Sequence, residues 1–179
     1  MKVLIPLAEG FEEIEAVTVI DILRRAGIEA VTAALKNNPV TGSHRIPVTA
    51  DIHLDENFNF DAIILPGGMP GSTNLKNDNR IINIIKKIHA AGGLTAAICA
   101  APMVLSKAGI LKNKKFTCFP GYENEITEGI HLHENVVSDG SIITGIGAGC
   151  AALFALEIVK YLKNEKTAKE VKDKIIAFW

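Results

Sequence analysis

Short apolar runs alternate along this chain with longer stretches in which apolar residues recur at helical spacing. KVLIPL (residues 2–7), EAVTAA (29–34) and LTAAIC (94–99) are apolar runs of strand length. Residues 12–26 and 78–91 carry apolar stripes typical of amphipathic helices. Because a helix that connects two neighbouring strands makes them parallel, this alternation predicts an α/β fold, with a mostly parallel sheet covered by helices on both faces.

The same signals predict the remaining elements. DAIIL before a glycine turn, KFTCF and GSIITG are predicted strands, and Pro39 and Gly42 mark a hairpin. Further helices are expected over residues 102–108, 149–162 and 168–178. No linker, repeat or low-complexity segment is visible in the sequence, so residues 1–179 are expected to form a single domain.

The composition excludes several classes of protein. Apolar residues make up 48% of the 179 residues, too many for an intrinsically disordered chain. Lys and Arg number 19 against 20 Asp and Glu, a formal charge of -1, so no basic field is available for nucleic acid or an anionic membrane surface. No run approaches the ~20 apolar residues of a membrane helix, and the first run is too short for a secretory signal.

The cysteines indicate a reducing compartment. Cys99, Cys118 and Cys150 are odd in number, widely spaced and without a C-x-x-C pair. Reduced thiols and a cytoplasmic location are therefore expected rather than a disulfide framework. Cys118 and Cys150 are interpreted as core thiols.

Three strand ends carry unusual residues. AEGFEEIEA follows the first strand, LPGGMPGS ends the DAIIL strand, and AICAAP ends the LTAAIC strand. In open parallel sheets, ligands bind beyond the carboxyl ends of the strands. We therefore expect these three segments to meet in one functional site.

Cys99 stands where a predicted strand turns into a helix, with Ala97 and Ala101 on either side. A sharp strand–nucleophile–helix turn requires small residues at such positions. The helix N-terminus would also favour a thiolate. Cysteine is also a common small core residue, so these residues alone leave a reactive and a structural role equally open.

The glycines of LPGG could supply hydrogen-bond donors close to Cys99. The backbone N–H groups of Gly67 and Gly68 could stabilise an oxyanion beside Cys99. A tight turn chosen for backbone freedom is the alternative, and by itself the more common one.

Three glutamates open the first predicted helix: Glu12, Glu13 and Glu15. Acidic residues in a first helical turn commonly complement the helix dipole. Glu15 shares an apolar stripe with Val19, so its carboxyl is expected to be partly buried, but Glu12 also projects toward an apolar stripe and periodicity does not separate the two. A buried carboxyl beside a thiolate would have a raised pKa, and it could donate a hydrogen bond to the sulfur or shuttle a proton.

Two further motifs resemble parts of cofactor sites, but each lacks a residue that such a site needs. His131 and His133 form an H-x-H pair that has no third ligand nearby in the sequence, so no metal site is expected. TGIGAGC (residues 144–150) resembles a phosphate loop, but the acidic residue that a dinucleotide fold needs on a later strand is missing. No cofactor is predicted.

In this order, AEGFEEIEAV, LPGGMPG, AAICAAP and TCFPGYE resemble the ThiJ/PfpI superfamily, and within it the branch of the Parkinson-disease deglycase protein. The resemblance covers essentially the whole chain. It implies a flavodoxin-like three-layer sandwich, similar to class I glutamine amidotransferases, and a homodimer. It also implies glyoxalase or deglycase activity on methylglyoxal or early glycation adducts, in stress protection, without a cofactor.

The resemblance also implies roles for individual residues. Cys99 matches the nucleophile and Glu15, rather than Glu12, the protonated glutamate beside it. Gly68 matches the oxyanion-type glycine, and the N–H of Ala100 is the implied second donor.

Other positions bear on substrate binding or depart from the family pattern. Gly67, His44 and Arg25 are the expected substrate-binding residues. His44, with Arg45 next to it, stands where some relatives have an arginine, and Arg25 matches a basic residue that can approach the partner subunit's site. Phe119 replaces a histidine of some relatives and excludes a catalytic triad through that position.

Three functions are therefore considered. The first is an enzyme acting through Cys99 and Glu15 on a small aldehyde or a glycated protein. The second is an oxidative-stress sensor or chaperone that uses oxidation of Cys99 without significant turnover. A peptidase or amidotransferase is the least favoured, because no histidine is evidently placed to pair with Cys99.

Overall fold

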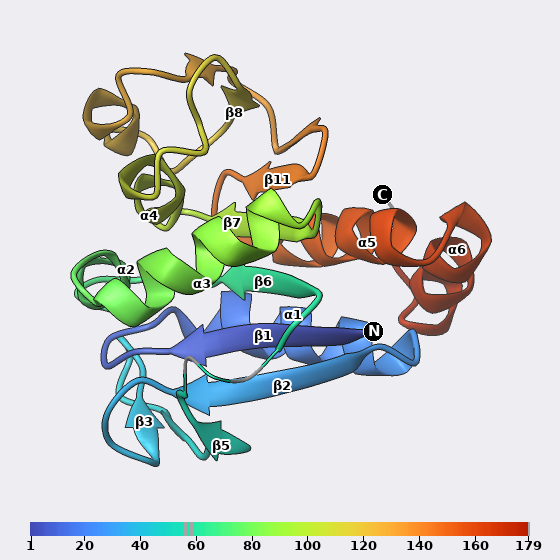
Figure 1. Cartoon of the computed structure of the whole chain (residues 1–179). Coiled ribbons are helices and arrows are strands. Elements are labelled where there is room, and N and C mark those ends of the chain that lie inside the picture. The colour runs from blue at the N-terminus through green and yellow to red at the C-terminus, as the bar shows by residue number, and fades with distance from the viewer. Residues whose placement is uncertain (56, 58, 179) are drawn as a thin grey trace.

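A mostly parallel sheet forms the middle layer of the molecule (Figure 1). The computed structural model describes residues 1–55, 57 and 59–178. Within them, one seven-stranded sheet has the spatial order β10 (Val136–Asp139), β11 (Ile142–Gly145), β7 (Leu94–Ile98), β6 (Ala62–Leu65), β1 (Lys2–Leu7), β2 (Glu29–Ala34) and β5 (Ile52–His53). Only the edge pair β10–β11 is antiparallel in this sheet, because those two strands are joined by a tight turn. The predicted fold class is confirmed.

Helices cover both faces of the sheet, as predicted (Figure 1). One face packs against α1 (Glu13–Arg25), α5 (Ala151–Leu162) and α6 (Glu165–Lys174), and the other against α2 (Gly71–Lys76), α3 (Asn79–Ala90) and α4 (Pro102–Lys107). Alternate residues of β1 divide between the layers, since Val3 and Ile5 join the core under α1 while Leu4 joins the core under α3. Burial on both faces explains why the strands read as continuous apolar runs.

The strand order fixes where a ligand can approach. From β1 the chain passes to β2 on one side and then crosses to β6 on the other. The order β2-β1-β6-β7-β11 is that of flavodoxin-like folds, and its switch point lies between β1 and β6. The segments after β1, β6 and β7 therefore meet at one edge of the sheet.

The chain ends in a helix that lies earlier than predicted. Residues 168–178 were the expected range, whereas α6 spans Glu165–Lys174. It begins there because the Asn164 side chain accepts a hydrogen bond from the N–H of Thr167 at 2.9 Å.

Short elements account for the other differences. The six residues of α2 lack the length of an apolar stripe, so no helix was predicted there. The strand expected in KFTCF is only β8 (Lys115–Phe116), which pairs with β9 (Ile130–His131) outside the main sheet. The predicted hairpin is confirmed as β3 (Val40–Thr41) and β4 (Pro47–Val48).

Two 3₁₀ turns complete the described chain. They are η1 (Tyr122–Glu125) and η2 (Ala148–Cys150), and η2 takes the first residues of the helix expected over 149–162. Among the described residues, no helix combines the length and the apolar character needed to cross a membrane.

Candidate active site

Cys99 sits in a strained turn between β7 and α4. Its φ is +63°, a left-handed conformation that residues other than glycine rarely adopt. Backbone hydrogen bonds hold the turn on both sides: the Cys99 N–H donates to the Gly145 carbonyl at 2.9 Å, and the Phe119 N–H donates to the Cys99 carbonyl at 2.8 Å. A cost of about 1–3 kcal/mol is typical of such a conformation, so the surrounding structure has to maintain it. This is the geometry of a nucleophile elbow.

Glu15 lies in the first turn of α1 and is fully buried. Its Oε2 accepts a hydrogen bond from the Gly67 N–H at 2.8 Å. Its Oε1 has no hydrogen-bond partner of ordinary geometry within the described part of the chain. Glu12 instead turns toward the hairpin, where its Oε2 accepts from the Ser43 hydroxyl at 3.2 Å. The structure therefore separates the two glutamates that periodicity left open, and brings Glu15 to Cys99.

Burial controls the protonation of this pair. It raises the pKa of Glu15 to about 7, although the Gly67 N–H and the Cys99 thiol favour the carboxylate and oppose the rise. Burial also raises the pKa of Cys99 to about 12, with the charge of Glu15 as the second cause. The predicted raised pKa of the glutamate agrees with the structure.

The predicted stabilisation of a Cys99 thiolate holds only in part. The sequence suggested that a helix N-terminus would lower the pKa of Cys99, but α4 has six residues and starts only at Pro102. The N–H groups of Gly68 and Ala100 do lower the pKa, yet burial outweighs them. The net direction is therefore a raised pKa of the Cys99 thiol, with burial as its largest cause.

Because the two groups interact, their protons are best counted together. The first proton leaves the pair near pH 7, and the second leaves only in more alkaline solution. In the one-proton form the Glu15 carboxylate stands beside a thiol, so it can accept the thiol proton when sulfur attacks a substrate.

Two consecutive glycines after β6 complete the site. A Cβ atom on Gly67 would lie 2.6 Å from the Cβ of Cys99 and 2.7 Å from Oε2 of Glu15, so this close approach excludes a side chain. Gly68 has a φ of +86° and directs its N–H to the Cys99 sulfur, as does Ala100. These two N–H groups form the predicted pair of donors, while the Gly67 N–H holds Glu15 rather than facing a substrate.

Glu13 is a buried residue whose role the sequence did not reveal. It is 6% exposed and accepts hydrogen bonds from the backbone N–H of His44 at 2.8 Å, from His44 Nδ1 at 3.0 Å and from the Ile46 N–H at 3.3 Å. The bond to Glu13 raises the pKa of His44. His44 is thus engaged with the start of α1. Gly42 is the sequence feature that allows the contact between Glu13 and His44. A Cβ atom at position 42 would collide with the Glu13 carboxylate.

Arg25 lies away from this site within one chain. It is in the last turn of α1, where its Nε donates to Asp21 Oδ2 at 2.6 Å. A helix rises about 15 Å over the residues from Glu15 to Arg25. Its expected contact with the site of a partner subunit stays a prediction.

A shallow hollow of about 390 Å³ adjoins the elbow. Phe119 and Pro120 line one side, and the TGIGAGC segment that resembled a phosphate loop lines the other. Phe119 is 48% exposed and packs edge-on against Tyr122, with ring centroids 6.4 Å apart. The hollow therefore offers an apolar side chain at the position where some relatives were expected to have a histidine.

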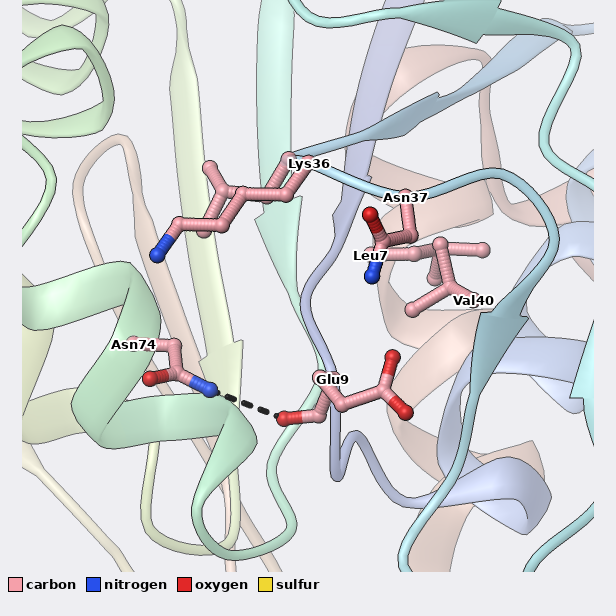
Figure 2. A pocket seen from close by; sticks show the side chains of 7 residues that line it. Leu7, Glu9, Lys36, Asn37, Val40 and Asn74 are labelled. Carbon is pink, nitrogen blue, oxygen red and sulfur yellow. Dashed lines mark hydrogen bonds between the residues drawn. The ribbon is translucent and has the colours of Figure 1, made fainter.

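A second, smaller pocket of about 100 Å³ lies at the ends of β1 and β2 (Figure 2). The Asn74 amide donates to the Glu9 carbonyl at 3.0 Å across it. The lining residues are Leu7, Glu9, Leu35, Lys36, Asn37, Val40 and Asn74. Neither Cys99 nor Glu15 contributes, so this pocket is separate from the candidate active site.

Comparison with known proteins agrees with this fold. The DJ-1/PfpI family matches residues 1–161. Protein DJ-1 homolog B of Arabidopsis thaliana is 39% identical over 170 residues, and glutathione-independent glyoxalase DJR-1.2 of Caenorhabditis elegans is 37% identical over 174 residues, 94% of this chain and 92% of that protein. The solved structure of oxidized DJ-1 from Toxoplasma gondii superposes with a TM-score of 0.95 at 35% identity and covers 99% of both chains.

The chain belongs to the DJ-1/PfpI family. The match to the nematode relative spans 92% of that protein. The match to the Arabidopsis protein spans 92% of this chain but only 39% of the length of that relative.

Proposed function

We propose that this protein is a cysteine-dependent enzyme of the glyoxalase or deglycase type, acting on methylglyoxal or on early glycation adducts. The observation that carries the proposal is the Cys99 elbow facing the buried Glu15, with the N–H groups of Gly68 and Ala100 at the sulfur. The name of the nematode relative, a glutathione-independent glyoxalase, supports the same class.

The reaction begins with the Cys99 thiol. Sulfur attacks the aldehyde carbon of methylglyoxal while the Glu15 carboxylate accepts the thiol proton, and a hemithioacetal forms. The aldehyde oxygen gains negative charge as the C–S bond forms. The N–H groups of Gly68 and Ala100 stabilise that charge, and the oxygen then takes the proton back from Glu15, which becomes a carboxylate again.

Glu15 then acts on the substrate carbon. It removes the proton from the carbon that bears sulfur and delivers it to the neighbouring carbonyl carbon, while the hydroxyl proton of the hemithioacetal passes to the carbonyl oxygen. The carbonyl group becomes a secondary alcohol and the carbon that bears sulfur becomes a thioester carbonyl. The electrons of the two carbons are redistributed within the substrate, so no external oxidant or reductant is needed. Water hydrolyses the resulting thioester, releases lactate and restores the Cys99 thiol.

Turnover of methylglyoxal with detection of lactate tests this proposal. Cys99→Ser and Glu15→Gln should each lower kcat/KM more than about a hundredfold, because each removes a group in contact with the reacting atoms. Cys150→Ser is the matched control, since its thiol donates to the Asn135 and Gly147 carbonyls rather than facing the Cys99–Glu15 pair. Full turnover in a folded Cys99→Ser protein would refute the mechanism.

A second candidate function is an oxidative-stress sensor or chaperone that uses Cys99 oxidation. Its support is that Cys99 is partly exposed while Cys118 and Cys150 are buried, and that the similar Toxoplasma structure is of an oxidized protein. Peroxide titration with mass spectrometry would favour this function if Cys99 were oxidised first in a protein that turns over no methylglyoxal. Oxidation of all three thiols at the same rate would count against it.

A homodimer is part of the proposal. Ile14 and Val17 lie on one exposed stripe of α1, at 57% and 49% exposure, and Ile46 in the adjacent hairpin is 55% exposed. Covering them would remove apolar surface from water. Sedimentation should show a dimer that Val17→Asp weakens, while Tyr161→Asp, another exposed position, leaves it intact.

The cellular compartment is likewise proposed rather than observed. The balanced charge and the free, partly or fully buried thiols fit a cytoplasmic protein. Fractionation of cells that express the protein would test this.

A further inference from the structure

Cys118, Glu123 and His131 form a cluster outside the candidate active site. One ligand atom from each, the thiol sulfur, a carboxylate oxygen and a ring nitrogen, lie within 4.8 Å of one another. The H-x-H pair therefore has the third and fourth candidate ligands that the sequence did not reveal. Cys118 comes from the segment after β8 and Glu123 from η1, and the pairing of β8 with β9 brings His131 alongside them.

We infer that Cys118, Glu123 and His131 form a binding site for a divalent transition metal of the zinc type. Thiolate, carboxylate and imidazole are the three ligand types that Zn²⁺ uses in proteins. Their mixed softness disfavours Mg²⁺ and Ca²⁺, which prefer oxygen ligands throughout. This site is independent of the proposed function, because none of its residues belongs to the Cys99–Glu15 pair.

The cluster is held by the fold around it. Phe116 pairs with His131 across β8 and β9, and their ring centroids lie 5.3 Å apart. The Leu132 N–H donates to the Phe116 carbonyl at 2.8 Å, which fixes the register on the far side of His131. Cys118, two residues after Phe116, is 1% exposed and belongs to the core under α3 and α4. Two of the three ligands are thus fixed by backbone pairing and core packing.

Glu123 is the third member of the cluster and is partly buried. Its Oε2 accepts the Gly121 N–H at 2.6 Å and lies 4.0 Å from the Cys118 sulfur. An ionised carboxylate has further lone pairs after one such bond, so it can still bind a cation. The ligands of a tetrahedral zinc ion are about 3.5 Å apart, so small side-chain rotations would bring the three atoms into coordination distance.

His133 is placed to supply a fourth ligand. Its ring lies edge-on to that of His131, with centroids 4.7 Å apart, and the side chain is exposed. If His133 rotates inward the coordination is complete; otherwise a water takes the fourth position. Because zinc binds the thiolate, loading exchanges the Cys118 proton for the metal and releases that proton to solvent.

A second group of possible ligands, Glu12, Glu13 and His44, does not carry the same inference. Glu13 already accepts several hydrogen bonds from the hairpin, so these contacts explain why the three residues meet. Among the described residues, no set of hydrogen-bond donors comparable to the one around Glu13 surrounds the Cys118 thiol.

Calorimetric titration of the chelator-treated protein with Zn²⁺ tests the site, and Co²⁺ serves as a spectroscopic probe. We expect one ion per chain and, with Co²⁺, a thiolate-to-cobalt charge-transfer absorption band. Cys118→Ser should remove the band, and His131→Gln and Glu123→Gln should each weaken Zn²⁺ binding more than about tenfold. The two latter residues are partly exposed, so their replacement tests the site even if Cys118→Ser fails to fold.

Cys99→Ser and Cys150→Ser are the matched controls and should leave the band and the affinity unchanged. Loss of the band in Cys99→Ser would move the metal to the active site and overturn the inference. Zn²⁺ affinity that is unchanged in His131→Gln and Glu123→Gln would also overturn it. Hydrogen exchange gives a further readout, since Zn²⁺ should slow exchange of the Phe119 amide, which follows Cys118 directly.

Discussion

Glu15 and Gly67 are joined by a 2.8 Å hydrogen bond from the Gly67 N–H to the Glu15 carboxylate, although 52 residues separate them in the chain. The bond links the segment after β1 to the segment after β6, across the switch point of the sheet. It fixes one carboxylate oxygen and holds the carboxyl group beside Cys99. The same contact therefore sets both the position and the proton affinity of the acid.

Glu15→Gln should change how stability depends on pH. The pKa of Glu15 is about 7 in the folded protein against an ordinary 4.5, so folding favours its protonated form. The pH-dependent loss of unfolding free energy from burying Glu15 is therefore absent below pH 4.5. It grows as pH rises to 7 and then stays constant. The full cost is about 3 kcal/mol.

Urea unfolding across this pH range measures the effect. Relative to wild type, Glu15→Gln should gain about 3 kcal/mol of unfolding free energy between the acidic and the alkaline end. Glu134→Gln, at an exposed carboxyl, is the control and should show no such gain. A constant difference between Glu15→Gln and wild type at every pH would contradict the assignment.

The rate of methylglyoxal turnover should depend on the same proton. The reactive form of the pair holds one proton, so kcat/KM should rise about tenfold per pH unit and level off above about pH 7. Glu15→Gln should remove this rise from whatever activity remains. A rate that instead falls as pH increases through 7 would indicate that Glu15 acts from its protonated form.

Gly67→Ala should damage both stability and activity. The added methyl group would meet the Cβ of Cys99 and the Glu15 carboxylate, and one of them has to move. We expect a loss of about 1–3 kcal/mol of stability and about a hundredfold in kcat/KM. Gly149→Ala is the control for stability, because nothing lies within 4 Å of a Cβ at that position.

Glu13→Ala should loosen the hairpin. It removes the acceptor for the N–H groups of His44 and Ile46, two residues of the turn between β3 and β4. Leaving these groups without a partner costs about 1–3 kcal/mol for each one that water does not reach. Hydrogen exchange should become faster in residues 41–48 and stay unchanged in α3. Unchanged protection of the His44 amide would show that another group holds the turn.

The sequence allowed the fold class and the main site residues to be predicted, because both depend on local patterns. Strand length and helical stripes predict the parallel sheet, and the ends of parallel strands lie at one edge. That was sufficient to place the segments that carry Cys99, Gly68 and the two glutamates at one edge. The choice of Glu15 over Glu12 needed the resemblance or the structure, since both face apolar stripes.

The remaining features depend on contacts that leave little local signal. Glu13 meets a hairpin some thirty residues later, through backbone N–H groups that no side-chain pattern identifies. Cys118 meets His131 through strands of two residues each, too short to be recognised. Burial raises the pKa of Cys99 and nearby N–H groups lower it, so the direction of the net shift depends on which effect is larger. That balance follows from the three-dimensional structure and not from the sequence pattern.

The bond between the Phe119 N–H and the Cys99 carbonyl has a consequence for variation at position 119. The elbow is supported there by the peptide backbone, so the identity of the side chain is not what keeps Cys99 in its left-handed conformation. A histidine, a phenylalanine or an alanine could occupy the position with the same support, and proline alone would remove the donor. Relatives can therefore exchange the chemical character of that wall of the site without rebuilding the nucleophile.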